Sequence, residues 1–218
     1  MTVDLTALGW DEAFSLGYAP LDRSDAAPAR VLRTELGVCT VLGVDGVTRA
    51  SLGGSALLAA ARDPAARPCP GDWVVVRRWP DRRHTVEAVL PRRSVLTAPA
   101  GRTVTGAGSL AANVDSVVSV GAHAGADLDE LRELVSPGRT LALVGGTADQ
   151  RSALVGALTG VTALPPRTNS PTAVHRQVRR PACRSVLVPV PGGGAVVDVA
   201  GTGSGRMPRC AQSTRSSL

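Results

Sequence analysis

Short stretches rich in β-branched and apolar residues recur along the first half of the chain, and turn signals separate them. They fall at residues 30–34, 38–44, 47–52, 73–79 and 85–90. Segments of this length and composition are typical of β-strands. Asp45 followed by Gly46, between two valine-bearing stretches, predicts a hairpin with a type I′ turn, in which both central residues have positive φ. Five strands in so short a span indicate a small barrel.

A different pattern begins after residues 97–110, a stretch rich in Gly, Thr, Ala and Pro that we interpret as a linker. Residues 140–144 form a compact apolar run typical of a buried strand. A glycine-bearing loop follows, and then an expected helix at 152–159 that stops at Gly160. Strand, loop and helix in this order form the usual phosphate-binding unit. The sequence therefore predicts an α/β domain after the barrel.

Three further segments complete this half of the chain. Asp127 and Glu130 form a capping box that predicts the start of a helix. Residues 184–190 and 195–199 flank a glycine-rich turn and predict a β-hairpin that ends at an aspartate. The tail, residues 202–218, has no hydrophobic periodicity and is expected to be disordered.

The basic residues all belong to one type. The chain contains no lysine, so its 24 basic residues are arginines, and the net charge is +6. They gather in pairs at 77/78, 82/83 and 92/93, and again between residues 176 and 184. Clustered arginines favour polyanion binding, because each neutralised phosphate releases counterions. RNA is one expected partner, and the other interpretation is that the arginines only solubilise turns and strand edges.

Several classes of protein are disfavoured by what the sequence lacks. No apolar run of about 18 residues could span a bilayer. The acidic start lacks the basic flank and apolar stretch of a secretion signal. We therefore expect a cytoplasmic protein without a membrane partner. The four cysteines lie far apart, with no histidine at zinc-ligand spacing, so no zinc site is expected. No role is assigned to His84, His123 or His175.

Eight segments, in the same order along the chain, carry a resemblance to a known family. They are Leu8-Gly9-Trp10, Ala29-Arg30-Val31, Pro70-Gly71-Asp72-Trp73-Val74, Val89-Leu90-Pro91-Arg92-Arg93-Ser94, Ala111-Ala112-Asn113-Val114-Asp115, Gly125-Ala126-Asp127-Leu128-Asp129-Glu130-Leu131, Pro137-Gly138-Arg139-Thr140-Leu141-Ala142-Leu143-Val144-Gly145 and Pro191-Gly192-Gly193-Gly194-Ala195-Val196-Val197-Asp198. On these segments the chain resembles the ribosome small-subunit-dependent GTPase A family. That family combines an OB-fold, a circularly permuted GTPase domain and a C-terminal zinc module.

The resemblance implies an OB-fold β-barrel followed by a reduced α/β P-loop GTPase-like domain. It divides the chain into an N-terminal segment (1–27), an OB-fold RNA-binding domain (28–96), a linker (97–110), a truncated GTPase-like domain (111–201) and a disordered tail (202–218). It further implies GTP with Mg²⁺ as ligand, and the 30S ribosomal subunit with its 16S rRNA as partners. A monomer that acts late in small-subunit maturation is expected.

The phosphate loop departs from the family pattern. The motif G-x-x-x-x-G-K-S falls on residues 145–152, where Gln150 and Arg151 replace the second glycine and the lysine. Gln150 would need a backbone state natural for glycine. Arg151 brings a planar fork where a compact ammonium is wanted. Asp149 adds a like charge close to the phosphates, at a cost on the order of 4 kcal/mol.

If nucleotide still binds, the resemblance assigns the site residue by residue. Phosphates would be held by Gly145, Gly146 and Arg151, the γ-phosphate would meet Gly201, and Mg²⁺ would be held by Ser152 and Asp198. Two other interpretations stay open. The loop could simply connect a strand to a helix, and Asp198 could be the polar end of a strand.

Other GTPase elements are missing. The Asn-Lys-x-Asp motif that reads guanine belongs between Val118 and Ala122, and a chain without lysine cannot supply it. The threonine-rich switch falls near residues 179–184, where the hydroxyl ligands are gone. The zinc module would follow Gly201, and its absence suggests a truncated or frameshifted gene.

The barrel keeps the candidate RNA contacts. They are Arg77, Arg78, Trp79, Arg82, Arg83, Arg92 and Arg93. Trp79 beside Arg77 either offers a stacking surface for an unpaired base or packs into the protein, whereas Trp73 is expected in the core. The sequence thus indicates a ribosome-associated GTPase-like protein that binds rRNA and, by resemblance, binds and hydrolyses GTP. The alternatives are a non-catalytic rRNA-binding remnant and a chain without a stable fold.

Overall fold

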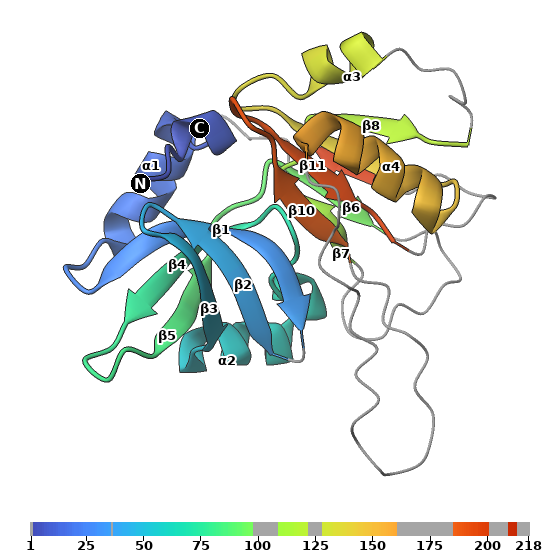
Figure 1. The fold of residues 1–218 in the computed structure, drawn as a ribbon. Coiled ribbons are helices and arrows are strands. Elements are labelled where there is room, and N and C mark those ends of the chain that lie inside the picture. Colours follow the sequence, from blue (N-terminus) through green and yellow to red (C-terminus); the bar gives the residue numbers. More distant parts are fainter. Residues whose placement is uncertain are drawn as a thin grey trace, which may run out of the picture.

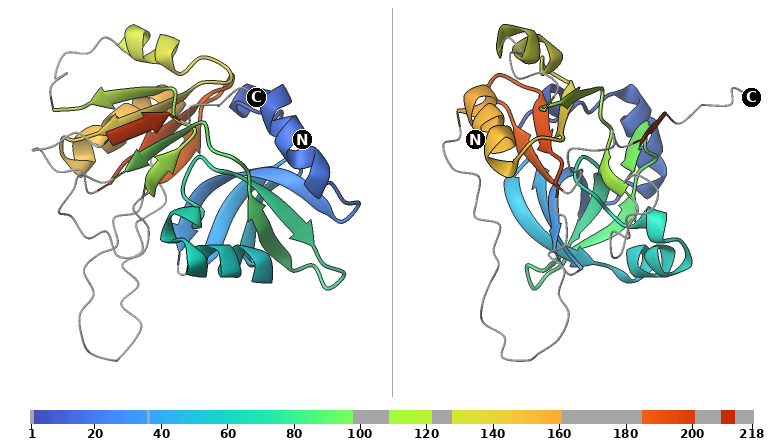
Figure 2. Two further views of the ribbon diagram at one scale, coloured as in Figure 1. Left: turned by 180° about the vertical axis from the view of Figure 1, so that it is seen from behind. Right: turned by 90° about the vertical axis from the view of Figure 1, so that its right-hand side faces the viewer.

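The computed structural model describes residues 2–35, 37–97, 109–121, 128–160 and 185–200, together with the backbone of 209–212. A β-barrel and an α/β unit lie side by side, and the N-terminal helix α1 caps one end of the barrel (Figures 1 and 2). This is the fold class expected from the sequence, a barrel followed by an α/β domain.

The barrel contains five strands and is closed, in the order β1-β2-β3-β5-β4. Its strands are β1 (Ala26–Glu35), β2 (Val38–Gly43), β3 (Gly46–Leu52), β4 (Trp73–Arg78) and β5 (His84–Val89). Neighbouring strands pair antiparallel except β3 and β5, whose short parallel pairing closes the barrel. Inward-facing residues such as Val31, Val74 and Val86 are fully buried, because alternate residues of a strand point to the same side.

Two local features of the barrel differ from expectation. The β2–β3 hairpin forms, but only Gly46 has positive φ (104°) and Asp45 does not. The turn is therefore not type I′, which needs positive φ at both central positions. A helix, α2 (Gly54–Arg62), and a short 3-10 turn, η3 (Pro64–Ala66), stand between β3 and β4, where the strand pattern gave no helical signal.

The N-terminal segment packs across the end of the barrel. It contains η1 (Thr6–Leu8), α1 (Glu12–Tyr18) and η2 (Ala19–Leu21). The carboxylate of Asp11 accepts hydrogen bonds from the backbone N–H groups of Ala13 and Phe14 and so caps α1. The ring centroid of Trp10 lies 4.9 Å from that of Trp73, which is fully buried. Trp73 is a core residue, as expected.

The α/β unit is built on a four-stranded sheet of order β10-β11-β9-β8. Its elements are β8 (Ser116–Ser119), α3 (Leu128–Leu134), β9 (Thr140–Val144), α4 (Ala148–Thr159), β10 (Val186–Pro189) and β11 (Ala195–Asp198). Leu141 and Leu143 of β9 pack with residues of α3 and α4, while Ala142 and Val144 pack on the opposite side of the sheet. The buried strand at 140–144 and the hairpin before Asp198 are both confirmed.

A small second sheet covers that opposite side. Its strands are β6 (Ser94–Thr97), β7 (Ser109–Ala112) and β12 (Arg209–Gln212), in the order β12-β6-β7. Leu96 and Ala111 belong to the same hydrophobic cluster as Ala142 and Val144. Because β12 pairs with β6, the disorder expected for the whole tail does not extend to residues 209–212.

Candidate nucleotide and RNA sites

The loop between β9 and α4 is shorter than a phosphate loop. Only Gly145, Gly146 and Thr147 separate the strand from α4, which begins at Ala148 rather than at Ser152. Thr147 and Gln150 form a capping box: the Thr147 hydroxyl accepts from the Gln150 N–H at 3.2 Å, and the Gln150 amide oxygen accepts from the Thr147 N–H at 2.8 Å. Those N–H groups are therefore already satisfied within the chain, whereas a phosphate loop leaves them free for an anion.

Glycine would be needed at position 150 to turn the chain into a phosphate cradle. With Gln150 there, the backbone continues as helix, which is the state its side chain stabilises by capping. Gly145 and Gly146 do have positive φ, at 71° and 53°, and use it to turn the chain directly into α4. The expected eight-residue loop is thus replaced by a tight strand-to-helix connection.

The side chain of Arg151 fills the space behind this connection. Its Nε donates to Oδ1 of Asp198 at 2.5 Å, and its NH1 donates to the carbonyl oxygen of Gly145 at 2.7 Å. Longer hydrogen bonds, of 3.3 Å each, run to the carbonyls of Gly146 and Thr147. Arg151 and Asp198 are almost completely buried. The cation thus faces the protein interior and not the solvent where a nucleotide would approach.

The remaining residues considered at this site are Ser152, Asp149 and Gly201. Ser152 is exposed on α4, and Asp149 is exposed in the first turn of the helix. Gly201 and the switch region at 179–184 lie outside the described residues, as does Asp127 of the expected capping box. The described part of the chain holds no group of three or more His, Cys, Asp and Glu residues that could bind a metal ion.

Arg92, one of the candidate RNA arginines, has several internal partners. Arg92 binds Asp72 through two 2.7 Å contacts, from Nε to Oδ1 and from NH2 to Oδ2, and donates further to the carbonyls of Ala65 and Arg67. Burial alone would lower the pKa of Arg92, but the hydrogen bonds and charge of Asp72 outweigh it and raise that pKa. Arg92 is thus engaged within the protein and is not free to bind RNA.

Arg93 is committed in a similar way. Its guanidinium forms an ion pair with Asp11 and lies over the ring of Phe14, 4.2 Å from the ring centroid. These contacts join α1 to the segment between β5 and β6.

The other five candidates lie at the end of β4 and in the turn that leads to β5. The guanidinium of Arg77 lies over the ring of Trp79, 4.0 Å from its centroid, and pairs with Asp25 at 2.7 Å. The indole N–H of Trp79 donates to Thr85 at 2.8 Å. The half-buried Trp79 therefore presents a fixed ring at the surface, with one face covered by Arg77. Arg78, Arg82 and Arg83 are exposed.

Known proteins with similar sequences were found for part of this chain. No family profile matches the chain. A small ribosomal subunit biogenesis GTPase RsgA from Streptomyces coelicolor is 32% identical over 133 residues, which is 61% of this chain and 35% of that protein. The RsgA protein of Opitutus terrae is 34% identical over 125 residues, covering 53% of this chain and 34% of its own length. The chain is thus similar to RsgA proteins over somewhat more than half of its own length.

Two solved structures also match the chain at low similarity. YjeQ from Thermotoga maritima superposes with a TM-score of 0.46 and 18% identity, over 82% of this chain and 76% of the other. YloQ, a circularly permuted GTPase, gives a TM-score of 0.45 and 14% identity, over 82% and 72%. The chain spans about a third of the length of the curated RsgA relatives that it matches. No helix of the described part is long and apolar enough to cross a membrane.

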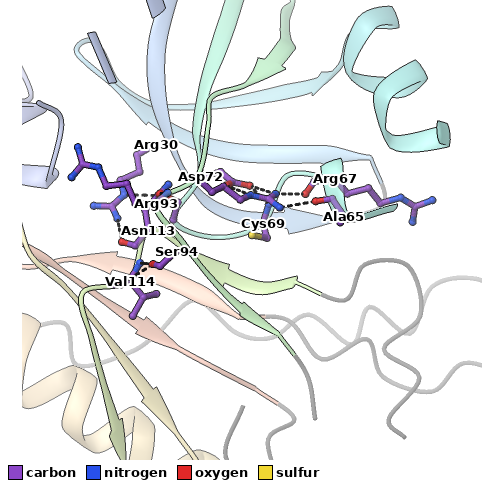
Figure 3. A network of polar contacts seen from close by, with 11 residues as sticks. Arg30, Ala65, Arg67, Cys69, Asp72, Arg93, Ser94, Asn113 and Val114 are labelled. Atoms are coloured by element: carbon purple, nitrogen blue, oxygen red, sulfur yellow. Dashed lines mark hydrogen bonds and ion pairs between the residues drawn. The ribbon is translucent and has the colours of Figure 1, made fainter. Parts of the chain in front are cut away.

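One cluster of polar contacts that the sequence did not reveal joins the barrel to the α/β unit. Arg30 of β1 is buried and donates to the carbonyl of Asn113 at 3.3 Å (Figure 3). It also donates to the carbonyls of Leu8 and Gly71 (3.4 Å) and to the hydroxyl of Thr140 at 2.7 Å. Burial lowers its pKa to about 10, which leaves it charged at neutral pH. The strand pattern at residues 30–34 gave no sign of this burial, and only the many distant partners of Arg30 reveal its role.

Asn113 is the second residue of this junction. Its side-chain oxygen accepts from the Arg93 N–H at 2.9 Å, and its amide donates to the Gly71 carbonyl at 3.0 Å. Its φ of 54° is uncommon outside glycine but tolerated by asparagine. A sequence signal did exist, because asparagine is among the residues that adopt this conformation most readily.

Proposed function

We propose that this chain is a non-hydrolysing RNA-binding protein of small ribosomal subunit biogenesis, with the 30S subunit and its 16S rRNA as partners. The observation that carries the proposal is the buried Arg151–Asp198 pair, which occupies the nucleotide end of the sheet. The homology to RsgA supports the ribosomal context. A cytoplasmic monomer fits this role.

The α/β unit is poorly suited to a triphosphate for three physical reasons. Two of the backbone N–H groups that could face a phosphate, those of Thr147 and Gln150, are used by the capping box. The cation that should reach outward donates to carbonyls behind the loop. Asp149, in the first turn of α4, brings a negative charge toward the approaching anion, at a cost on the order of 4 kcal/mol if it lies near 4 Å. Together these features favour a structural rather than a nucleotide-binding domain.

Mg²⁺ does not fit the candidate ligands either. Asp198 Oδ1 is bound by the Arg151 guanidinium at 2.5 Å, so a metal ion would have to displace a buried cation. Ser152, the other candidate ligand, is exposed on α4. No step of GTP hydrolysis is therefore assigned to these residues.

RNA binding rests on the barrel and its exposed arginines. Arg78 and Arg82 stand beside the fixed ring of Trp79, and exposed guanidinium groups next to an aromatic side chain are suited to single-stranded nucleic acid. Arg92 and Arg93, with internal partners, support the barrel instead of binding RNA.

Two measurements on the purified full chain test the proposal. A fluorescent GTP analogue, titrated with Mg²⁺, should show no saturable binding up to about 1 mM, while the chain should sediment with small ribosomal subunits equally with and without GTP. Sedimentation should weaken as salt rises, because phosphate contacts release counterions. Phosphate release from GTP that small subunits stimulate, and that Asp198→Ala abolishes, would instead establish the GTPase.

A further inference from the structure

A hollow of about 820 Å³ opens at one end of the barrel. It is lined by the start of β1, the β2–β3 turn and the β4–β5 turn, and its apolar lining includes Pro28, Val41 and Val76. Sites for small organic ligands usually measure about 300–1,000 Å³. We call this hollow the barrel-end pocket.

One side of the barrel-end pocket is held in place by internal contacts. Arg77 is fixed between Asp25, at 2.7 Å, and the ring of Trp79, at 4.0 Å from its centroid. Thr85 accepts from the indole N–H and fixes the ring from its other edge. A wall arranged in advance lowers the conformational entropy lost when a ligand binds. The charge of Arg77 is already compensated by Asp25.

Two further guanidinium groups at the barrel-end pocket are uncompensated. Arg78 and Arg82 line it and are exposed, and neither forms an ion pair with any residue that the structure describes. Besides the paired Asp25, the lining contains one other acidic residue, Asp45. The pocket therefore combines an apolar floor, a fixed aromatic wall and a net positive rim. A nucleotide, with a planar base and a phosphate, has the matching chemistry.

Arg82 adds an independent observation. Its φ is 65°, in the left-handed region that glycine adopts without strain and that a long side chain rarely adopts. The turn is closed by the Arg82 N–H donating to the Trp79 carbonyl at 2.9 Å and by the Trp79 N–H donating to the Arg83 carbonyl at 2.9 Å. Backbone strain of this kind concentrates at ligand-binding positions. Here the strained residue carries one of the two uncompensated charges of the pocket.

We propose that the barrel-end pocket receives one unpaired nucleotide of a single-stranded RNA segment. The base enters against the apolar floor beside Trp79, and Arg78 and Arg82 bind the flanking phosphates. The inference rests on the proposed function, because it names the form of RNA that the barrel binds. Bases in a duplex are stacked and paired and cannot enter a pocket, so the site selects single strands.

The test uses the full chain and fluorescein-labelled RNA followed by fluorescence anisotropy. A single-stranded octanucleotide should bind more tightly than a duplex of the same length. Arg82→Gly should weaken single-strand binding about tenfold, since one charge-assisted phosphate contact is lost. The same variant should raise Tm by about 2–4 °C, because glycine relieves the positive φ. Loss of affinity together with a gain in stability cannot come from partial unfolding.

Arg62→Gly provides the matched control. Arg62 ends α2, is exposed and does not line the pocket, so its removal lowers the net charge equally but should change affinity less than twofold. Equal affinity for duplex and single strand would contradict the proposed pocket. Equal losses of affinity in Arg82→Gly and Arg62→Gly would contradict it as well. Sedimentation with small subunits separates the two proposals: subunit binding without an Arg82 effect retains the proposed function alone. Single-strand binding with the Arg82 effect but without subunit binding retains the pocket alone.

Discussion

The guanidinium of Arg151 and the carboxylate of Asp198 neutralise each other inside the α/β unit, 2.5 Å apart and almost without solvent contact. They join the first turn of α4 to the end of β11, two elements that pack together at the centre of the domain. A charge pair in that position fixes the spacing of helix and strand, which a bound nucleotide and its metal would otherwise help to set. Its energetic role can be measured directly.

Removal of the arginine should destabilise the fold strongly. Arg151→Met removes the cation that neutralises the buried Asp198, and such a loss costs about 3–5 kcal/mol. Urea unfolding followed by circular dichroism measures the change. Arg132→Met is the control, because the Arg132–Asp129 pair is exposed and worth less than about 1 kcal/mol. Similar losses in the two variants would show that the buried pair has no special role.

Restoration of the missing glycine and lysine should reopen the loop. In Gln150→Gly/Arg151→Lys the capping box is lost and a glycine enters the helix, which together cost about 2 kcal/mol. The loss of the Arg151 contacts with Asp198 and Gly145 adds to this cost. Affinity for a fluorescent GTP analogue should rise at least about tenfold over the unmodified chain, because loop N–H groups and a compact ammonium become available. Competition by ATP should be as effective as by GTP. Tight GTP binding by the unmodified chain would contradict this account of the loop.

Arg92 should matter for folding and not for RNA. Arg92→Ala leaves the fully buried Asp72 without its partner, so the free energy of unfolding should fall by about 3 kcal/mol or more. Anisotropy with single-stranded RNA, measured well below Tm, should give an unchanged dissociation constant. Arg78→Ala should behave in the opposite way, with weaker RNA binding and unchanged stability. A higher dissociation constant for RNA in Arg92→Ala would show that Arg92 contributes to RNA binding.

Buried thiols should make the fold sensitive to alkali. Burial raises the pKa of Cys39 to about 12, and it also raises the pKa of Cys69. The stabilisation from a protonated Cys39 is complete below about pH 9, where the unfolded thiol ionises, and is lost as pH rises toward 12. The free energy of unfolding should fall by up to about 1.4 kcal/mol per pH unit for each thiol.

Urea unfolding between pH 8 and 11 measures this slope, and Cys39→Ala should make it shallower. The comparison isolates the thiol from other groups that titrate in this range, such as Arg30. Iodoacetamide should label Cys39 slowly in the folded protein at pH 8, because the thiolate is the reactive form. Rapid labelling without unfolding would contradict the burial of this side chain.

Local patterns predicted the strands well. The apolar run at 140–144 became β9 with the same bounds, and α4 ends before Gly160, whose φ of 70° lets it cap the helix. The start of α4 was missed although its signal was present. Thr147 followed three residues later by Gln150 is a capping-box sequence, but alignment to the phosphate-loop motif placed the helix start at Ser152.

Side-chain partners were the part that local patterns could not supply. Arg92 and Arg93 look alike in sequence to the pairs at 77/78 and 82/83, yet their carboxylates, Asp72 and Asp11, come from distant segments. Hydrophobic periodicity reports which side of a strand is buried and carries no information on which charges meet. The assignment of RNA contacts from paired arginines alone was therefore too broad.

The burial of Arg30 has a practical consequence for anyone who dissects this molecule. Its guanidinium donates hydrogen bonds to protein oxygens in three regions of the chain. These are Leu8 in the N-terminal segment, Gly71 before β4, and Asn113 with Thr140 in the α/β unit. Excision of the barrel would expose this cation on one side and strip away half of its acceptors. The α/β unit therefore supplies oxygens that a buried barrel residue needs, so the barrel should be studied together with it.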